Sequence, residues 1–395
     1  MRRTTVTALT ALLLGAPLLA ACTENASSSA GEGGGADTAR ALTVSSSDDA
    51  CEVSSADAPA GTLTFEVTNT GSRVTEFYLL AEDGLRIIAE VENIGPNASR
   101  TLTVNAPEGE YTAACKPGMV GDGIRSAFAV TRSDEAPVQV ADDELVDQAL
   151  TNYAAYVRDQ SSQLLAKTQQ FVTLYEAGDD DAARTLYPQA RTHWERIETV
   201  AESFGDLDPK MDLREADLEP GQRWTGWHLI EKDLWPARAQ ADGGYTALTP
   251  AQRTTFAQDL LTNTRDLDTR VQDLDYTVDQ IANGSVGLMD EVATGKVTGE
   301  EEFWSRTDLY DFQANVDGAR VAYEGVRPIV AENDADLADS LDTRFADLQE
   351  LLDAQRQGNG FTSYDALTAP QVKGLSDAVN ALSEPLSNLT ATVLS

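Results

Sequence analysis

Apolar and polar side chains alternate between residues 41 and 132, and short polar turns interrupt the alternation. A period of two residues is typical of strands that bury one face. The turns read NTGS, EDG, GPN and APEGE. The alternation is clearest at Leu42 and Val44, at Leu63, Phe65 and Val67, at Leu102 and Val104, and at Phe128 and Val130. The pattern predicts a small all-β domain, a sandwich or a barrel, over residues 41–132.

After Asp134 the apolar residues recur at helical spacing. Three runs show it: Leu150, Tyr153, Val157, Leu164 and Phe171; Leu260, Leu267, Val271, Leu274, Val278 and Ile281; and Leu337, Leu341, Phe345, Leu348 and Leu352. A helix with one apolar stripe buries that stripe against its neighbours. We therefore expect residues 135–395 to form an all-α helical bundle.

The first 22 residues place two arginines before an apolar run that is too short to cross a bilayer as a mature helix. This pattern predicts an export signal. Its last four residues, LAAC, resemble the lipobox of bacterial lipoproteins, which implies that Cys22 becomes the lipidated first residue of the mature chain. Residues 23–40 are rich in Gly, Ser and Ala and are expected to form a flexible linker. We expect an exported, extracytoplasmic protein, in the periplasm or its equivalent, held to the membrane by lipid alone.

Charge narrows the range of partners. The 395-residue chain carries 65 acidic and 29 basic residues, a formal net charge of -36. Such a field repels nucleic acid and anionic membrane surfaces and concentrates cations around the protein. We therefore expect no nucleic-acid partner.

Two cysteines remain beyond the export signal, Cys51 and Cys115, and two interpretations are open for them. Outside the cytoplasm they can form a disulfide that pins the all-β domain. Alternatively, Cys115 and Met119 flank a Pro-Gly turn and present soft ligands, which with Cys51 and Glu76 could hold copper or iron. The all-β domain has no histidine, so a type 1 copper centre is not expected. The disulfide and the metal site exclude each other, because a disulfide sulfur is a poor ligand.

In the helical region, His228 lies three residues before Glu231 in the segment WTGWHLIEKDLW. Residues three apart share one helix face, so the two side chains can converge on one point. The flanking aromatic residues predict burial, and Gly226 allows another helix to approach closely.

Two acidic pairs repeat this spacing beside aromatic residues: Glu195 with Glu198, and Asp308 with Asp311. Charged residues rarely occupy such surroundings unless they are paired or coordinate a metal. A histidine and carboxylates from facing helices form iron sites in other bundles, and hard oxygen ligands suit Fe(III). We predict an iron site formed by His228 and Glu231 and completed by Glu195, Glu198, Asp308 and Asp311.

The G-x-H-x-x-E motif of Gly226, His228 and Glu231 resembles the signature of the imelysin-like family, also called M75 peptidases. The all-β domain resembles a cupredoxin sandwich in its size, its strand pattern and its C-x-P-G-M loop. The long segments FGDLDPKMDLREADLEPGQRWTGWHLIEKDLW and TDLYDFQANVDGA resemble more narrowly the EfeO family, which joins a cupredoxin-like domain to an M75 bundle.

The resemblance to EfeO proteins implies an iron-binding component that works beside a membrane permease, EfeU, and a haem peroxidase, EfeB. The chain departs from the family at Arg306, where members often carry a histidine. Arginine does not ligate metals, so the resemblance implies a more carboxylate-rich site here, or an arginine that orients a carboxylate.

Two other functions, a zinc peptidase and a copper or redox protein, are alternatives to iron binding. A zinc peptidase usually needs two histidines one turn apart and a third ligand, and the bundle has only His193 and His228. His193 is interpreted as a partly buried partner of its helix neighbours. We therefore expect no M75-type peptidase turnover. A copper or redox role for the all-β domain remains the other alternative.

Overall fold

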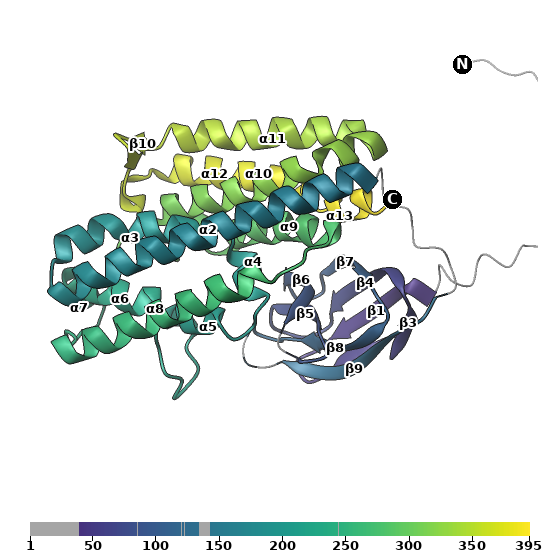
Figure 1. Ribbon diagram of the computed structural model, residues 1–395, viewed down its shortest axis with the longest axis horizontal. Coiled ribbons are helices and arrows are strands. Elements are labelled where there is room, and N and C mark those ends of the chain that lie inside the picture. Colours follow the sequence, from purple (N-terminus) through teal and green to yellow (C-terminus); the bar gives the residue numbers. More distant parts are fainter. Residues whose placement is uncertain (1–38, 85, 120, 122, 134–142, 244) are drawn as a thin grey trace, which may run out of the picture.

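The structure is a computed structural model that describes residues 39–84, 86–119, 121, 123–133, 143–243 and 245–395. A β-sandwich is followed along the chain by a larger helical domain, and the sandwich lies beside one end of the helices (Figure 1). The predicted fold class is therefore confirmed. The export signal, Cys22 and nearly all of the predicted linker lie outside the described residues.

The sandwich consists of two sheets with strand orders β2-β1-β4-β7 and β3-β9-β8-β5-β6. Alternate residues of β4 point inward, and Leu63, Phe65 and Val67 are completely buried, as the alternation predicts. Phe77 of the second sheet packs against Phe65 across the core. The strands are β1 (Ala41–Ser46), β2 (Cys51–Val53), β3 (Asp57–Pro59), β4 (Gly61–Asn69), β5 (Thr75–Leu80), β6 (Ile87–Ile94), β7 (Ser99–Ala106), β8 (Gly109–Cys115) and β9 (Ile124–Thr131).

Long helices α2, α8, α9, α10 and α11 form most of the helical domain (Figure 1). The predicted apolar stripes are buried in one continuous core, which includes Leu164, Phe171, Leu267 and Leu348. The helices are α2 (Asp143–Ala177), α3 (Asp180–Glu195), α4 (Glu198–Glu202), α5 (Asp208–Met211), α6 (Trp227–Leu234), α7 (Pro236–Gly243), α8 (Pro250–Gln272), α9 (Val278–Thr294), α10 (Asp308–Asn333), α11 (Ala335–Asp353), α12 (Ala369–Leu386) and α13 (Leu389–Val393). Short 3-10 turns are η1 (Glu215–Asp217), η2 (Lys296–Thr298) and η3 (Tyr364–Ala366), and β10 (Arg356–Gln357) pairs with β11 (Gly360–Phe361).

The sandwich is attached to the bundle mainly through α9. Arg100 of β7 forms a bidentate ion pair with Asp290, at 2.8 and 3.1 Å. The Asp279 carboxylate accepts a hydrogen bond from the Asn105 backbone N–H at 2.8 Å. These contacts fix the orientation of β7 against the helix. No helix in the described part of the chain is long and apolar enough to cross a membrane.

Candidate metal site

Helix α6 carries both residues of the G-x-H-x-x-E motif, and Gly226 immediately precedes it. Gly226 has a φ of 91°, which favours glycine, and a Cβ atom there would lie 2.1 Å from the Met211 carbonyl oxygen. The start of α6 therefore packs directly against the end of α5. This close approach brings His228 to Asp212, which follows Met211 in the chain.

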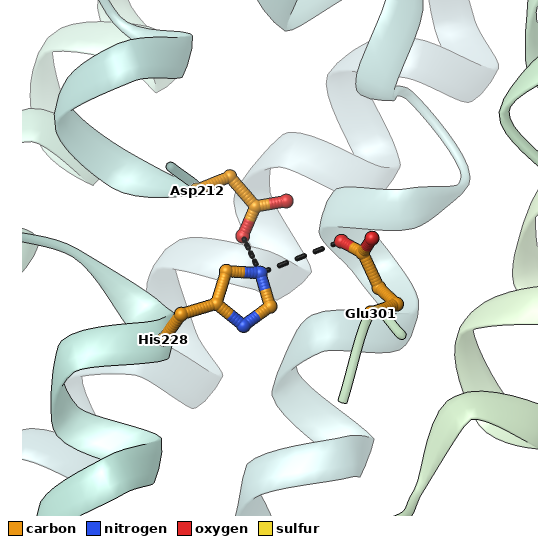
Figure 2. Close-up of side chains that lie close together, drawn as sticks. All are labelled: Asp212, His228 and Glu301. Carbon is orange, nitrogen blue, oxygen red and sulfur yellow. Dashed lines mark ion pairs between the residues drawn. The ribbon is translucent and has the colours of Figure 1, made fainter. Parts of the chain in front are cut away.

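His228 lies at the centre of the site and is only 1% exposed. Its Nε2 atom lies 3.4 Å from Asp212 Oδ1 and 3.4 Å from Glu301 Oε1 (Figure 2). Among the described residues, Nε2 has no hydrogen-bond partner. The two carboxylates come from irregular segments on different sides of the imidazole, so this nitrogen faces a converging pair of oxygens.

Glu231 orients the other side of the imidazole. Its Oε2 lies 3.4 Å from His228 Nδ1, and its Oε1 accepts hydrogen bonds from the Trp304 and Ser305 backbone N–H groups, at 2.8 and 2.6 Å. A carboxylate on one imidazole nitrogen fixes the ring orientation and frees the other nitrogen for a ligand. The imidazole and the two backbone N–H groups therefore hold Glu231 in place.

Three groups of side chains could each hold a metal ion, because their ligand atoms lie within 4.8 Å of one another. One contains Asp212, His228 and Glu301. The others contain His228, Glu231 and Glu302, or Glu195, Glu198, Asp212 and Glu301. The first and third share two carboxylates, and all the members are buried.

The chain supplies its own cations to this acidic interior. Arg191 of α3 is completely buried, and its guanidinium forms ion pairs with Glu195, Asp212, Glu301, Glu302 and Asp311. Lys296 is also completely buried, and its Nζ lies 3.0 Å from Glu195 Oε2 and 2.8 Å from Glu198 Oε2. A captured metal is therefore not the only means of making these buried carboxylates tolerable, because basic side chains of the chain itself pair with them.

Electrostatics favours the protonated form of His228 in this arrangement. Burial and Arg191 lower the pKa of His228, but the carboxylates of Asp212, Glu231 and Glu301 outweigh them and raise it well above its usual value. Burial, with Glu302 nearby, raises the pKa of Glu231 to about 7. A metal bound at Nε2 must therefore displace a proton.

The predicted acidic pairs separate into two roles. Glu195 and Glu198 lie side by side and face Lys296. Asp308 and Asp311 are completely buried near the cluster but belong to none of the three groups. Asp308 Oδ1 accepts a hydrogen bond from the Glu302 backbone N–H at 3.0 Å, and Asp311 Oδ2 lies 3.7 Å from Arg191 Nε. Both therefore support the segment and the arginine around the site.

Sequence reasoning missed Asp212, Glu301, Glu302, Arg191 and Lys296. Asp212 follows α5, and the two glutamates follow η2, so none lies in a run of helical periodicity. The available signal was their position beside apolar and aromatic residues, in KMDL and GEEEFW. In the prediction from sequence, this signal identifies only acidic pairs spaced three residues apart.

The remaining polar residues singled out in the bundle lie outside the cluster. His193 Nδ1 is 2.8 Å from Gln160 Oε1 of α2, and burial, with Arg196 nearby, lowers the pKa of His193 to about 4. Arg306 donates to the Gly299 carbonyl oxygen and pairs with Asp365, whose side chain is half exposed. Arg306 therefore does not orient a carboxylate of the three groups.

In the sandwich, Cys51 and Cys115 form a disulfide between β2 in one sheet and β8 in the other. The mixed site of Cys51, Glu76, Cys115 and Met119 is wrong for this oxidised state, because both sulfurs are bonded to each other. Glu76 accepts a hydrogen bond from Tyr78, and Met119 is 42% exposed. The first of the two open alternatives, the disulfide, is the one present.

Comparisons with known proteins agree with both domains. The imelysin family model, Peptidase M75, matches residues 149–389, and the cupredoxin-like domain model matches residues 10–130. The fold and the G-x-H-x-x-E site are thus those of an imelysin-type bundle joined to a cupredoxin-like domain.

Relatives of the whole chain narrow the family. The chain is 34% identical to the "Iron uptake system component EfeO" of Yersinia pseudotuberculosis over 88% of this chain and 89% of that protein. It is 33% identical to the protein of the same name from Escherichia coli, over 88% and 89% of the two chains. An "Efem/EfeO family lipoprotein" of Staphylococcus haemolyticus is 41% identical over 62% of this chain and 83% of that protein. The chain belongs to the EfeO family.

Proposed function

We propose that this protein is the extracytoplasmic, lipid-anchored iron-binding component of an Efe-type iron-uptake system. The names of its relatives support iron uptake and, for the staphylococcal relative, a lipoprotein. The lipobox-like segment ending at Cys22 supports a lipid anchor. The net charge of -36 supports cation capture, because it raises the local concentration of metal ions.

One observation supports the iron site most directly: the buried His228 Nε2 lies 3.4 Å from a carboxylate oxygen of Asp212 and 3.4 Å from one of Glu301, in two long ion pairs, and forms no hydrogen bond with the described residues. Two ligand atoms 3.4 Å apart, each about 2.1 Å from the same ion, subtend an angle of about 110° at that ion. Such an angle is ordinary in metal coordination. We therefore assign Asp212, His228 and Glu301 as the primary ligands. Glu231 becomes a positioning residue rather than a primary ligand.

The donor chemistry favours iron over softer metals. The site offers one imidazole and several carboxylates, and the described part of the bundle contains no cysteine. Carboxylate oxygens suit hard cations such as Fe(III), and imidazole also suits Fe(II). The mixed set can therefore accept ferrous or ferric iron as cargo.

Delivery requires partners that the chain itself does not contain. We propose that the anchored protein hands iron to an EfeU-like permease and that an EfeB-like haem peroxidase supplies any oxidation. The acidic surface and the lipid anchor keep the cargo near the membrane where such a permease lies.

We propose no peptidase turnover. His228 is 1% exposed, so a peptide bond cannot approach its nitrogen in this conformation. Catalytic metal sites keep one coordination position open to water and substrate. The buried cluster is instead suited to enclosing an ion.

Anaerobic Fe(II) titration with a competing chelator tests the proposal. His228→Ala removes the imidazole and should weaken affinity more than about 100-fold, since loss of a ligand exceeds the 10–100-fold typical of supporting residues. His193→Ala is the matched control, because it removes the other buried histidine, and it should stay within about threefold of wild type. Equal affinities of the His228 variant and wild type would refute the site.

A further inference from the structure

Lys296 places its ammonium beside carboxylates that could hold a metal ion, so a cation of the chain itself occupies that position. It begins η2, directly after α9, and its side chain is completely buried. Its Nζ lies within 3.0 Å of oxygens of both Glu195 and Glu198. These two glutamates are half of the group that, with Asp212 and Glu301, could hold a metal ion.

Asn315 of α10 holds the two glutamates in place. Its Nδ2 donates to Glu198 Oε2 at 2.9 Å and to Glu195 Oε2 at 3.3 Å. The two oxygens that face Lys296 are therefore positioned independently of the lysine. If the ammonium leaves, the carboxylates remain together and their repulsion favours another cation.

The lysine has a third carboxylate within reach. Glu291 Oε2 lies 4.0 Å from Lys296 Nζ, and the Glu291 side chain is 24% exposed, whereas those of Glu195 and Glu198 are 0% and 6% exposed. Glu291 also lines a cavity of about 700 Å³ between the sandwich and the bundle, together with Glu92 and Glu202. Rotation about the bonds of the unbranched lysine side chain would move its ammonium from the buried pair toward Glu291, which lies 4.0 Å away on this rim.

We propose that Lys296 is a tethered competitor of the cargo: iron held by Asp212 and Glu301 also draws in Glu195 and Glu198, whose ligand atoms lie within 4.8 Å of those two carboxylates, and so displaces the ammonium toward Glu291. The return of the ammonium promotes release. This inference rests on the proposed iron-binding function and adds its regulation. A tethered cation acts at a high effective concentration that does not depend on conditions outside the protein. It therefore limits affinity by a fixed amount, which suits a protein that must give up its cargo.

Lys296→Met tests the competition because it removes the charge and keeps an unbranched side chain. We expect Fe(II) affinity to rise at least tenfold and transfer of Fe(II) to a chelator to slow by a similar factor. Lys296→Arg, the matched control, keeps a cation and should stay within about threefold of wild type. If Lys296→Met binds and releases Fe(II) like wild type, the inference is overturned, while His228-dependent binding would leave the proposed function standing.

A second measurement uses the unmodified protein, in case the methionine variant does not fold. Acetylation of lysines followed by peptide mass spectrometry reports whether Lys296 Nζ is accessible. We expect Lys296 to be protected without metal and to react at least fivefold faster after Fe(II) loading, because the displaced ammonium faces the cavity. Lys232, which is paired with Glu215 outside the cluster, serves as the internal reference. Equal protection in both states would overturn displacement even if iron binding is confirmed.

Discussion

The sandwich and the bundle treat buried polar groups in opposite ways. The few buried polar side chains of the sandwich are almost all neutral and satisfied locally, as where Ser46 bonds Thr75 and Asn69 bonds the Ile94 carbonyl oxygen. In its described part, the bundle buries a group of eight carboxyls with two permanently charged basic side chains and with His228. The carboxyls are Glu195, Glu198, Asp212, Glu231, Glu301, Glu302, Asp308 and Asp311, and the basic side chains are Arg191 and Lys296.

Under the proposed function, the interior of the sandwich stabilises its fold, whereas the interior of the bundle binds an ion. Burying an ion costs several kcal/mol even after relaxation, and apolar residues of similar volume are often at least as stabilising as a buried ion pair. The sandwich shows that this chain can fill a domain interior with apolar side chains. Under the proposed function, the charged interior of the bundle serves ion binding rather than stability.

The largest expected effect concerns the bundle alone. Gly226→Ala should lower the free energy of unfolding by about 3–5 kcal/mol, because the new Cβ clashes with the Met211 carbonyl oxygen and the residue has a positive φ. Gly178→Ala is the matched control, since Gly178 also has a positive φ but has open space around it, and it should cost about 1 kcal/mol. Urea denaturation measures both, and equal losses would contradict the proposed close packing of α6.

The next effect concerns the sandwich alone. Replacing both Cys51 and Cys115 by Ser should lower the free energy of unfolding by about 4 kcal/mol, because the disulfide joins residues 64 apart in the sequence. Fe(II) affinity should stay within about twofold of wild type. A large loss of iron affinity in this variant would show that the sandwich takes part in binding and would end the contrast between the two domains.

A smaller effect separates ligand from positioning residue within the bundle. Glu231→Gln keeps the side-chain shape but removes the charge beside His228 Nδ1, so Fe(II) affinity should fall about 10–100-fold. Glu324→Gln, in an exposed pair with Arg320, should have no measurable effect. A loss as large as that of His228→Ala would instead make Glu231 a direct ligand.

The smallest expected effect is the change in Fe(II) affinity over a single pH unit. Since the raised pKa of His228 keeps its imidazole protonated without metal, binding at Nε2 releases a proton. Fe(II) affinity should therefore fall about tenfold for each pH unit between pH 7 and 5.5. Calorimetric titrations with Fe(II) in two buffers of different protonation enthalpy measure the number of protons released on binding. Affinity independent of pH would contradict binding at Nε2.

Local periodicity made the fold predictable, whereas the site depends on contacts between distant segments. The alternation around Phe65 and the helical spacing around Phe171 each report a buried face within one element. His228 and Glu231 could be paired because one helix turn separates them. Asp212 and Glu301 could not, because irregular segments carry them and only the packing at Gly226 brings Asp212 to the imidazole.

The buried basic residues and the disulfide could not be predicted from the sequence for other reasons. Arg191 and Lys296 belong to residue types that usually lie on the surface, and sequence spacing does not show that they turn inward. The sequence left the two cysteines open to a disulfide or to a metal site. The distance between their strands decides this, and it is set by how the two sheets pack.

Helix α9 makes the two domains mechanically dependent. Asp279 and Asp290 bind the sandwich, and the helix ends at Thr294, two residues before Lys296. A helix is a stiff rod that rises about 1.5 Å per residue, so tilting it at one end moves the other. If the proposed permease docked on the sandwich, a tilt of α9 would move the ammonium beside Glu195 and Glu198, and docking would be coupled to the release of iron.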